Sequence, residues 1–152
     1  MISKILVGVD FSGPSITSMD YAADLANKNK AELVLLNVLP EMQSRRPTPR
    51  GRIDVQKIKT GTEQNRRAML QEHADRLTGV YPDLKVKTIV RFGSETQNLI
   101  EAAKDENVDL IIVGNRGESG VVSWMLGSVS REIVESCTVP VLVVKDQRYC
   151  QL

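Results

Sequence analysis

A glycine-rich segment between residues 114 and 128 has the residue types and spacing to bind a phosphate group. Two residues separate Gly114 from Gly117, and nine more precede Gly127 and Ser128. Glycines admit positive φ and let main-chain N–H groups approach an anion without an intervening Cβ, and a serine hydroxyl adds a donor. If a helix starts at Ser128, its first turn adds unpaired N–H groups and the positive end of a dipole. We interpret the segment as a phosphate-binding loop; the alternative is a connector whose glycines only turn the chain.

Two charged residues are candidates for binding the same ligand. Asp10 directly follows the apolar run 5–9, and Arg116 lies inside the glycine-rich segment. Ligands of open parallel sheets bind beyond the carboxyl ends of the strands, so both positions suit a ligand, and Arg116 suits a phosphate. Asp10 could instead cap the next helix or form an Asx turn, as carboxylates at strand ends often do. We favour the ligand role for Asp10.

The remaining reactive residues fit structural roles better than catalytic ones. His73, the only histidine, is expected on an apolar helix stripe with Met69 and Leu77. Cys137 is expected on the inward stripe of the last helix with Ile133 and Val134, where it would pack as an inert thiol.

The basic residues between positions 45 and 67 are interpreted as a solvated loop and helix face. Binding of phosphates or of an acidic partner by this segment is the alternative.

Composition excludes several classes of function. The 152 residues, of which 41% are hydrophobic, fit one domain with an ordinary core. The formal net charge of +1 provides no general attraction to nucleic acid or to an anionic membrane. The apolar run at the start is too short for a signal peptide, and no stretch approaches the length of a membrane span. We therefore expect a cytoplasmic protein whose two cysteines are reduced.

Five apolar runs alternate with helical patterns along the chain. Strands are expected at 5–9, 33–38, 84–90, 108–113 and 139–144. Helices are expected from Gly13, over 62–78, after Ser94 and over 128–136, with a long mobile loop around 41–61. Such alternation predicts an α/β fold with one open parallel sheet and helices on both faces. The lysines of the third run suit an edge strand.

The segment Gly114-x2-Gly117-x9-Gly127-Ser128 resembles the ATP-binding signature of the universal stress protein (UspA-like) family. The runs 9–12 and 139–144 resemble that family too, so the likeness spans essentially the whole chain. It implies a Rossmann-like fold of the adenine nucleotide alpha hydrolase type, with five strands in the order 3-2-1-4-5. It also implies a homodimer joined through the last strand, 139–144, and ATP whose phosphates are bridged by Mg²⁺ or Mn²⁺.

The resemblance also implies roles for individual residues. Asp10 would meet the ribose and adenine side of the nucleotide, the main chain of Val38 would meet adenine, and Gly114 would lie beside the ribose. The phosphates would be held by Gly117, Gly127, Ser128, Val129 and Ser130.

Two residues depart from the family pattern. Glu95 stands where many members have proline, and Asn37 stands where histidine is common. Both lie outside the phosphate loop, so they bear on the branch of the family more than on nucleotide binding.

The leading functional hypothesis is an ATP-dependent regulatory or stress-response module with at most slow hydrolysis and an unidentified protein partner. The sequence contains no Walker A motif, histidine nucleophile or clear carboxylate pair. A metal-assisted ATPase using Asp10 and a regulatory dimer without nucleotide are the alternatives. A receiver-type phosphorylation switch fits poorly because Asp10 lacks an acidic neighbour. A dinucleotide enzyme lacks its glycine motif after the first strand.

Overall fold

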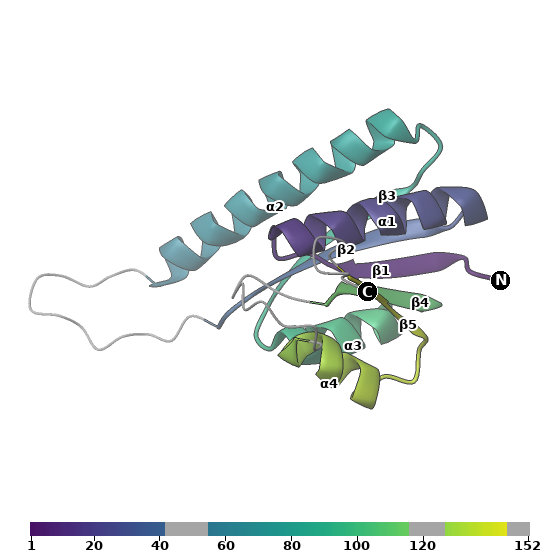
Figure 1. Cartoon of the computed structure of the whole chain (residues 1–152). Coiled ribbons are helices and arrows are strands. Elements are labelled where there is room, and N and C mark those ends of the chain that lie inside the picture. Colours follow the sequence, from purple (N-terminus) through teal and green to yellow (C-terminus); the bar gives the residue numbers. More distant parts are fainter. Residues whose placement is uncertain (42–54, 116–126, 146–152) are drawn as a thin grey trace, which may run out of the picture.

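The computed structural model of the protein describes residues 1–41, 55–115 and 127–145. Within these ranges strands and helices alternate along the chain, as the apolar runs predict (Figure 1). The strands are β1 (Lys4–Gly8), β2 (Glu32–Leu39), β3 (Val86–Phe92), β4 (Leu110–Gly114) and β5 (Val141–Val144). The helices are α1 (Gly13–Asn29), α2 (Val55–Val80), α3 (Glu95–Asp105) and α4 (Ser128–Ser136).

The strands form one parallel sheet in the order β3-β2-β1-β4-β5, which confirms the expected fold class and strand order. Val7 of β1 is in register with Leu35 of β2 on one side and with Ile112 of β4 on the other. The chain therefore reverses its direction of winding between β1 and β4, the point at which such sheets bind ligands. β3 forms one edge of the sheet, as its lysines indicate, and β5 forms the other.

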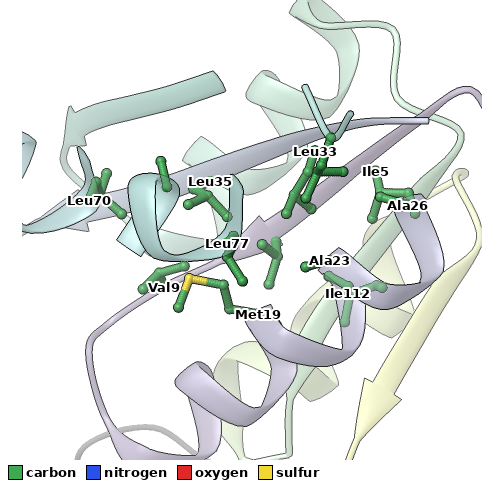
Figure 2. Close-up of a cluster of buried hydrophobic side chains, with 14 of the residues drawn as sticks. Ile5, Val9, Met19, Ala23, Ala26, Leu33, Leu35, Leu70, Leu77 and Ile112 are labelled. Atoms are coloured by element: carbon green, nitrogen blue, oxygen red, sulfur yellow. The ribbon is translucent and has the colours of Figure 1, made fainter. Parts of the chain in front are cut away.

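Helices cover both faces of the sheet. α1 and α2 pack on one face, and α3 and α4 on the other (Figure 1). Side chains alternate between the faces along β1: Ile5 and Val7 belong to the cluster under α1 and α2, and Leu6 to the cluster under α3 and α4. Figure 2 shows the first cluster, where Met19 of α1 and Leu77 of α2 meet the sheet. Two buried layers hold the strand ends in place.

Serine caps position the helices that begin near the strand ends. The Ser12 side chain accepts a hydrogen bond from the Ser15 amide at the start of α1, at 3.3 Å. Ser94 accepts one from the Gln97 amide at 3.4 Å at the start of α3, where the sequence predicts a cap.

The prediction of a loop over 41–61 is wrong for residues 55–61, which form the first turns of α2. Residues 42–54 lie outside the described residues. Gly61 lies inside the helix with open space around it, so its cost is limited to propensity. Contacts distant in sequence offset that cost, because Lys59 pairs with Glu41 at 3.0 Å and lies 4.4 Å from the centroid of the Phe92 ring.

Strand ends differ from the prediction by up to two residues. The third strand is displaced by two positions, from 84–90 to Val86–Phe92. Leu84 is buried but lies before the ladder, so burial alone misplaces the start of the strand.

The inward stripe predicted for the last helix is correct for Ile133 but wrong for Val134, which is 47% exposed. Cys137 ends α4 as its C-cap residue and packs, half-buried, against the cluster under α3 and α4. A short helix of this kind buries only a narrow stripe of side chains, so adjacent residues can differ strongly in exposure.

Candidate functional site

A cavity of about 320 Å³ opens beyond the carboxyl ends of β1, β2 and β4. Its wall is formed by strand ends, by the first turns of α3 and α4, and by the start of α1. The lining residues are Gly8, Val9, Asp10, Ser15, Leu36, Val38, Glu95, Leu99, Val113, Gly114, Gly127, Ser128, Val129 and Ser130. The cavity therefore lies where the sheet reverses its winding.

Most of the predicted site residues line this one cavity. They come from four elements or their ends: Asp10, Val38, Gly114, Gly127, Ser128, Val129 and Ser130. Arg116 and Gly117 lie outside the described residues.

Asp10 closes a tight turn while lining the cavity. Its Oδ1 accepts hydrogen bonds from the Ser12 amide, at 2.9 Å, and from the Ser12 hydroxyl. Between them Phe11 has φ +64°, the left-handed region that bulky residues rarely adopt. The Asx turn and the place in the cavity wall, which the sequence presents as alternatives, are thus combined in one carboxylate.

The ends of β1 and β2 are joined beyond the last residue of β1. The Val9 amide donates to the Leu36 carbonyl at 2.8 Å, and Asn37 Nδ2 donates to the Val9 carbonyl at 2.7 Å. Asn37 is 3% exposed, and its Oδ1 has no hydrogen-bond partner among the described residues. This asparagine thus holds in place the main chain that precedes Asp10 and Val38.

The first turn of α4 lines the cavity with Ser128, Val129 and Ser130. Gly127 is the N-cap, with φ −63° and ψ 165°, and it makes no side-chain capping bond. The first intrahelical bond runs from the Arg131 amide to the Gly127 carbonyl at 3.0 Å, so helix geometry leaves the amides of Ser128, Val129 and Ser130 without intrahelical acceptors. The Gly127 amide donates to the Asn115 carbonyl at 2.7 Å, which holds the turn against the end of β4.

Sequence reasoning missed part of the cavity wall. Gly8 packs against α3, because a Cβ at this position would lie 3.3 Å from Leu99 Cδ2. Leu99 and Glu95 line the cavity one helical turn apart. The sequence marks Glu95 as a departure from the family pattern, but only the packing of α3 places it at the cavity.

His73 and Cys137 do not line the cavity. His73 instead stacks on Phe11, with ring centroids 5.8 Å apart, which agrees with the packing role predicted for it.

The carboxylates with shifted pKa values lie at the opposite end of the sheet. The hydroxyl and amide of Ser3 and the amide of Lys4 donate to Asp109 and hold the pKa of that carboxyl below its usual range. Within the described ranges, no group of three or more His, Cys, Asp or Glu side chains is arranged to hold a metal ion. Nor, in those ranges, does any helix combine the length and apolar character needed to cross a bilayer.

Known proteins resemble this chain in both sequence and fold. Universal stress protein YxiE of Bacillus subtilis is 31% identical over 150 residues, covering 95% of this chain and 100% of that protein. The solved structure of MJ0577, a universal stress protein of Methanocaldococcus jannaschii, matches with a TM-score of 0.75 and 26% identity, covering 97% of this chain and 98% of that one. A universal stress protein solved in complex with cAMP matches with a TM-score of 0.66 and 24% identity, covering 94% and 96%; at this identity the likeness shows the fold alone.

The family model of the universal stress protein family matches residues 1–145. Together with the relatives and with the sheet order described above, this match establishes the family. The chain belongs to the universal stress protein family.

Proposed function

We propose that the cavity binds ATP and that the protein is a nucleotide-dependent regulatory module acting in the stress response. The observation that carries this proposal is that the first residues of α4 line the same cavity as Asp10 and Val38. A helix N-terminus suits phosphate, and a strand-end carboxylate suits ribose hydroxyls. The two chemistries are those of the two halves of a nucleotide.

In this proposal the two halves of the nucleotide lie against different elements of the fold. The phosphates would lie against Gly127, Ser128, Val129 and Ser130, which line the cavity at the start of α4. Ribose and adenine would lie toward Asp10, Gly114 and the main chain of Val38, at the ends of β1, β4 and β2. Arg116 and Gly117 would complete the phosphate side. The volume of about 320 Å³ falls at the lower end of the range for small-molecule sites, about 300 to 1,000 Å³.

A universal stress protein of this fold has been solved in complex with cAMP, so the fold itself can accommodate an adenine nucleotide. A divalent cation, Mg²⁺ or Mn²⁺, would bridge the phosphates and keep water in its remaining coordination positions. Mg²⁺ commonly binds through substrate phosphates and water, so its binding here would need few side-chain ligands.

Hydrolysis would be at most slow. The sequence contains no Walker A motif, histidine nucleophile or clear carboxylate pair. Two hydrogen bonds from Ser12 already occupy Asp10 Oδ1, so orienting a water would fall to Oδ2. A single-turnover assay tests the alternative, a metal-assisted ATPase. Phosphate release that Asp10→Ala abolishes while ATP still binds would favour the enzyme.

The module would act as a cytoplasmic homodimer joined through β5, which is one of the two edge strands of the sheet in the described part of the chain. Nucleotide occupancy would then change the surface presented to an unidentified protein partner. A regulatory dimer without nucleotide is the remaining alternative, and it predicts no heat of binding with ATP.

Ser128 offers a sharp test of the phosphate site, because it is the first residue of α4. Proline is tolerated at this position and removes the amide hydrogen together with the hydroxyl. The extended ψ of 165° at Gly127 suits a following proline. Ser128→Ala removes the hydroxyl and keeps the amide. Isothermal titration of ATP with magnesium should give wild-type binding below millimolar and a loss of about tenfold, or 1.4 kcal/mol, in Ser128→Pro relative to Ser128→Ala. Absence of wild-type binding at millimolar ATP would remove the proposal.

A further inference from the structure

Phe11 lies between the candidate site and helix α2 in an unusual backbone conformation. Three residues other than glycine have positive φ in the described part of the chain: Phe11, Lys30 and Asn107. Lys30 caps the C-terminus of α1 and Asn107 follows the cap of α3, where left-handed residues are common. Phe11 is at neither kind of position. A bulky residue keeps such a conformation only where its surroundings hold it.

The turn at Phe11 determines how Asp10 is presented. Because Phe11 is left-handed, the chain doubles back and brings the amide and hydroxyl of Ser12 onto Asp10 Oδ1. Ser12 also caps α1 through the Ser15 amide. A change at Phe11 therefore alters the direction of a carboxylate that lines the cavity.

Two side chains of α2 hold the Phe11 ring. His73 stacks on it at 5.8 Å between centroids, with 26° between the ring planes. The Arg66 guanidinium carbon lies 5.4 Å from the ring centroid, within the range of a cation–π contact. Arg66 Nε is buried and has no hydrogen-bond acceptor among the described residues, so within them no hydrogen bond at this atom competes with the ring in placing the guanidinium.

We propose that Phe11, held by Arg66 and His73, is a positioning residue that orients Asp10 toward the nucleotide and links α2 to the site. This inference rests on the proposed function for its ligand. Coupling between two sites is reciprocal, so nucleotide binding would in turn stabilise the contact of Arg66 with Phe11. Helix α2 becomes the element through which occupancy is transmitted away from the cavity.

The same helix supplies a matched control. Lys59 Nζ lies 4.4 Å from the centroid of the Phe92 ring at the end of β3. This contact, like that of Arg66 with Phe11, places a cation of α2 over an aromatic ring. Phe92 does not line the cavity, and Lys59 contacts Glu41 and Phe92 rather than the Asp10 turn in the described part of the chain. Arg66→Met and Lys59→Met each remove one cation and keep an apolar stem.

Two measurements on the full chain test the proposal. The first is NMR hydrogen exchange of the Ser12 amide, with the Gly93 amide, bonded to the Leu39 carbonyl at 2.8 Å, as the internal reference. The second is the affinity for ATP with magnesium. Arg66→Met should accelerate exchange at Ser12 but not at Gly93, and should weaken ATP binding about threefold to tenfold. Lys59→Met should leave Ser12 exchange and ATP affinity unchanged within twofold.

A double variant tests the route through the ring. Phe11→Leu should reproduce the effects of Arg66→Met, and combining the two should add little, because both break the same contact. Unchanged Ser12 exchange in Arg66→Met, or equal losses of affinity in Arg66→Met and Lys59→Met, would overturn the positioning role. If wild type binds no ATP while Ser12 exchange still responds to Arg66→Met alone, the proposed function fails, whereas the link between α2 and the Asp10 turn stands.

Discussion

Asn37 Nδ2 donates a hydrogen bond to the Val9 carbonyl oxygen at 2.7 Å, and each partner immediately precedes a candidate site residue. Val38 follows Asn37 on β2, and Asp10 follows Val9 beyond β1. The bond joins residues 28 positions apart in the sequence and is buried, so water competes little for its donor and acceptor. It sets the distance between the two strand ends that would hold ribose and adenine.

Asn37→Ala should therefore destabilise the protein and weaken nucleotide binding together. Loss of this buried bond should lower the free energy of unfolding by about 1 to 3 kcal/mol. Urea denaturation measures the stability, and titration with ATP measures the affinity. Asn29→Ala is the control, because Asn29 Nδ2 donates to the Leu25 carbonyl at 2.8 Å on an exposed helix surface. A change there of more than about 1 kcal/mol would show that the buried position is not what matters.

Replacing two glycines by alanine should change the free energy of unfolding in opposite directions. Gly93 has φ +121°, and a Cβ there would lie 3.2 Å from Asn98 Nδ2, so Gly93→Ala should lower the free energy of unfolding by about 1 to 3 kcal/mol. Gly61 lies inside α2 with nothing near a new Cβ, so Gly61→Ala should raise it by about 0.5 to 1 kcal/mol. Thermal unfolding of both variants beside wild type checks the signs. Destabilisation by Gly61→Ala would mean that residues 55–61 are not helical in solution.

Glu106 should contribute to acid sensitivity. The hydrogen bond from Lys87 Nζ, at 2.8 Å, is the largest cause that lowers the pKa of Glu106, and attraction to Lys4 adds to it against the effect of burial. A folded pKa below the unfolded value, about 4.3, stabilises the fold above that pH. The stabilisation is lost as pH falls through the folded pKa.

The variant Glu106→Gln should therefore be less stable than wild type at pH 7 and should lose less stability on acidification to pH 3. Urea midpoints across this range measure both effects. Glu63→Gln, which removes an exposed ion pair with Arg67 on α2, is the control and should follow the wild-type profile closely. If the urea midpoints of Glu106→Gln and wild type changed in parallel with pH, Glu106 would not contribute to the acid sensitivity.

The proposed dimer should depend on the outer edge of β5. The Pro140 and Val144 carbonyls accept bonds from β4, so the alternation of a parallel ladder turns the Val143 amide outward. Val143→Pro removes an outward donor that an edge strand can spare within one chain. We expect a folded monomer by sedimentation analysis, and a dimer for Val143→Thr. If Val143→Pro remains a dimer, the protomers meet elsewhere.

Patterns local in the sequence predicted most of the fold and much of the site. The five apolar runs and their helical spacers indicate the order of elements, because each run must be buried wherever the chain places it. Gly114, Gly127 and Ser128 indicate a phosphate loop, because a strand end and a helix start are adjacent along the chain there. The sequence predicts loop rather than helix at the start of α2, because Pro47, Pro49 and Gly61 interrupt the local helical pattern. The contacts of Lys59 with Glu41 and Phe92, which support these turns, come from distant positions of the chain.

The tertiary structure alone decided which distant residues meet. The bond of Asn37 to Val9, the contacts of Arg66 and His73 with Phe11, and the place of Glu95 in the cavity wall depend on how separate elements pack. Local sequence sets the preference of a segment for helix or strand. Contacts between segments depend instead on the burial of side chains against partners tens of residues away, which no short pattern encodes.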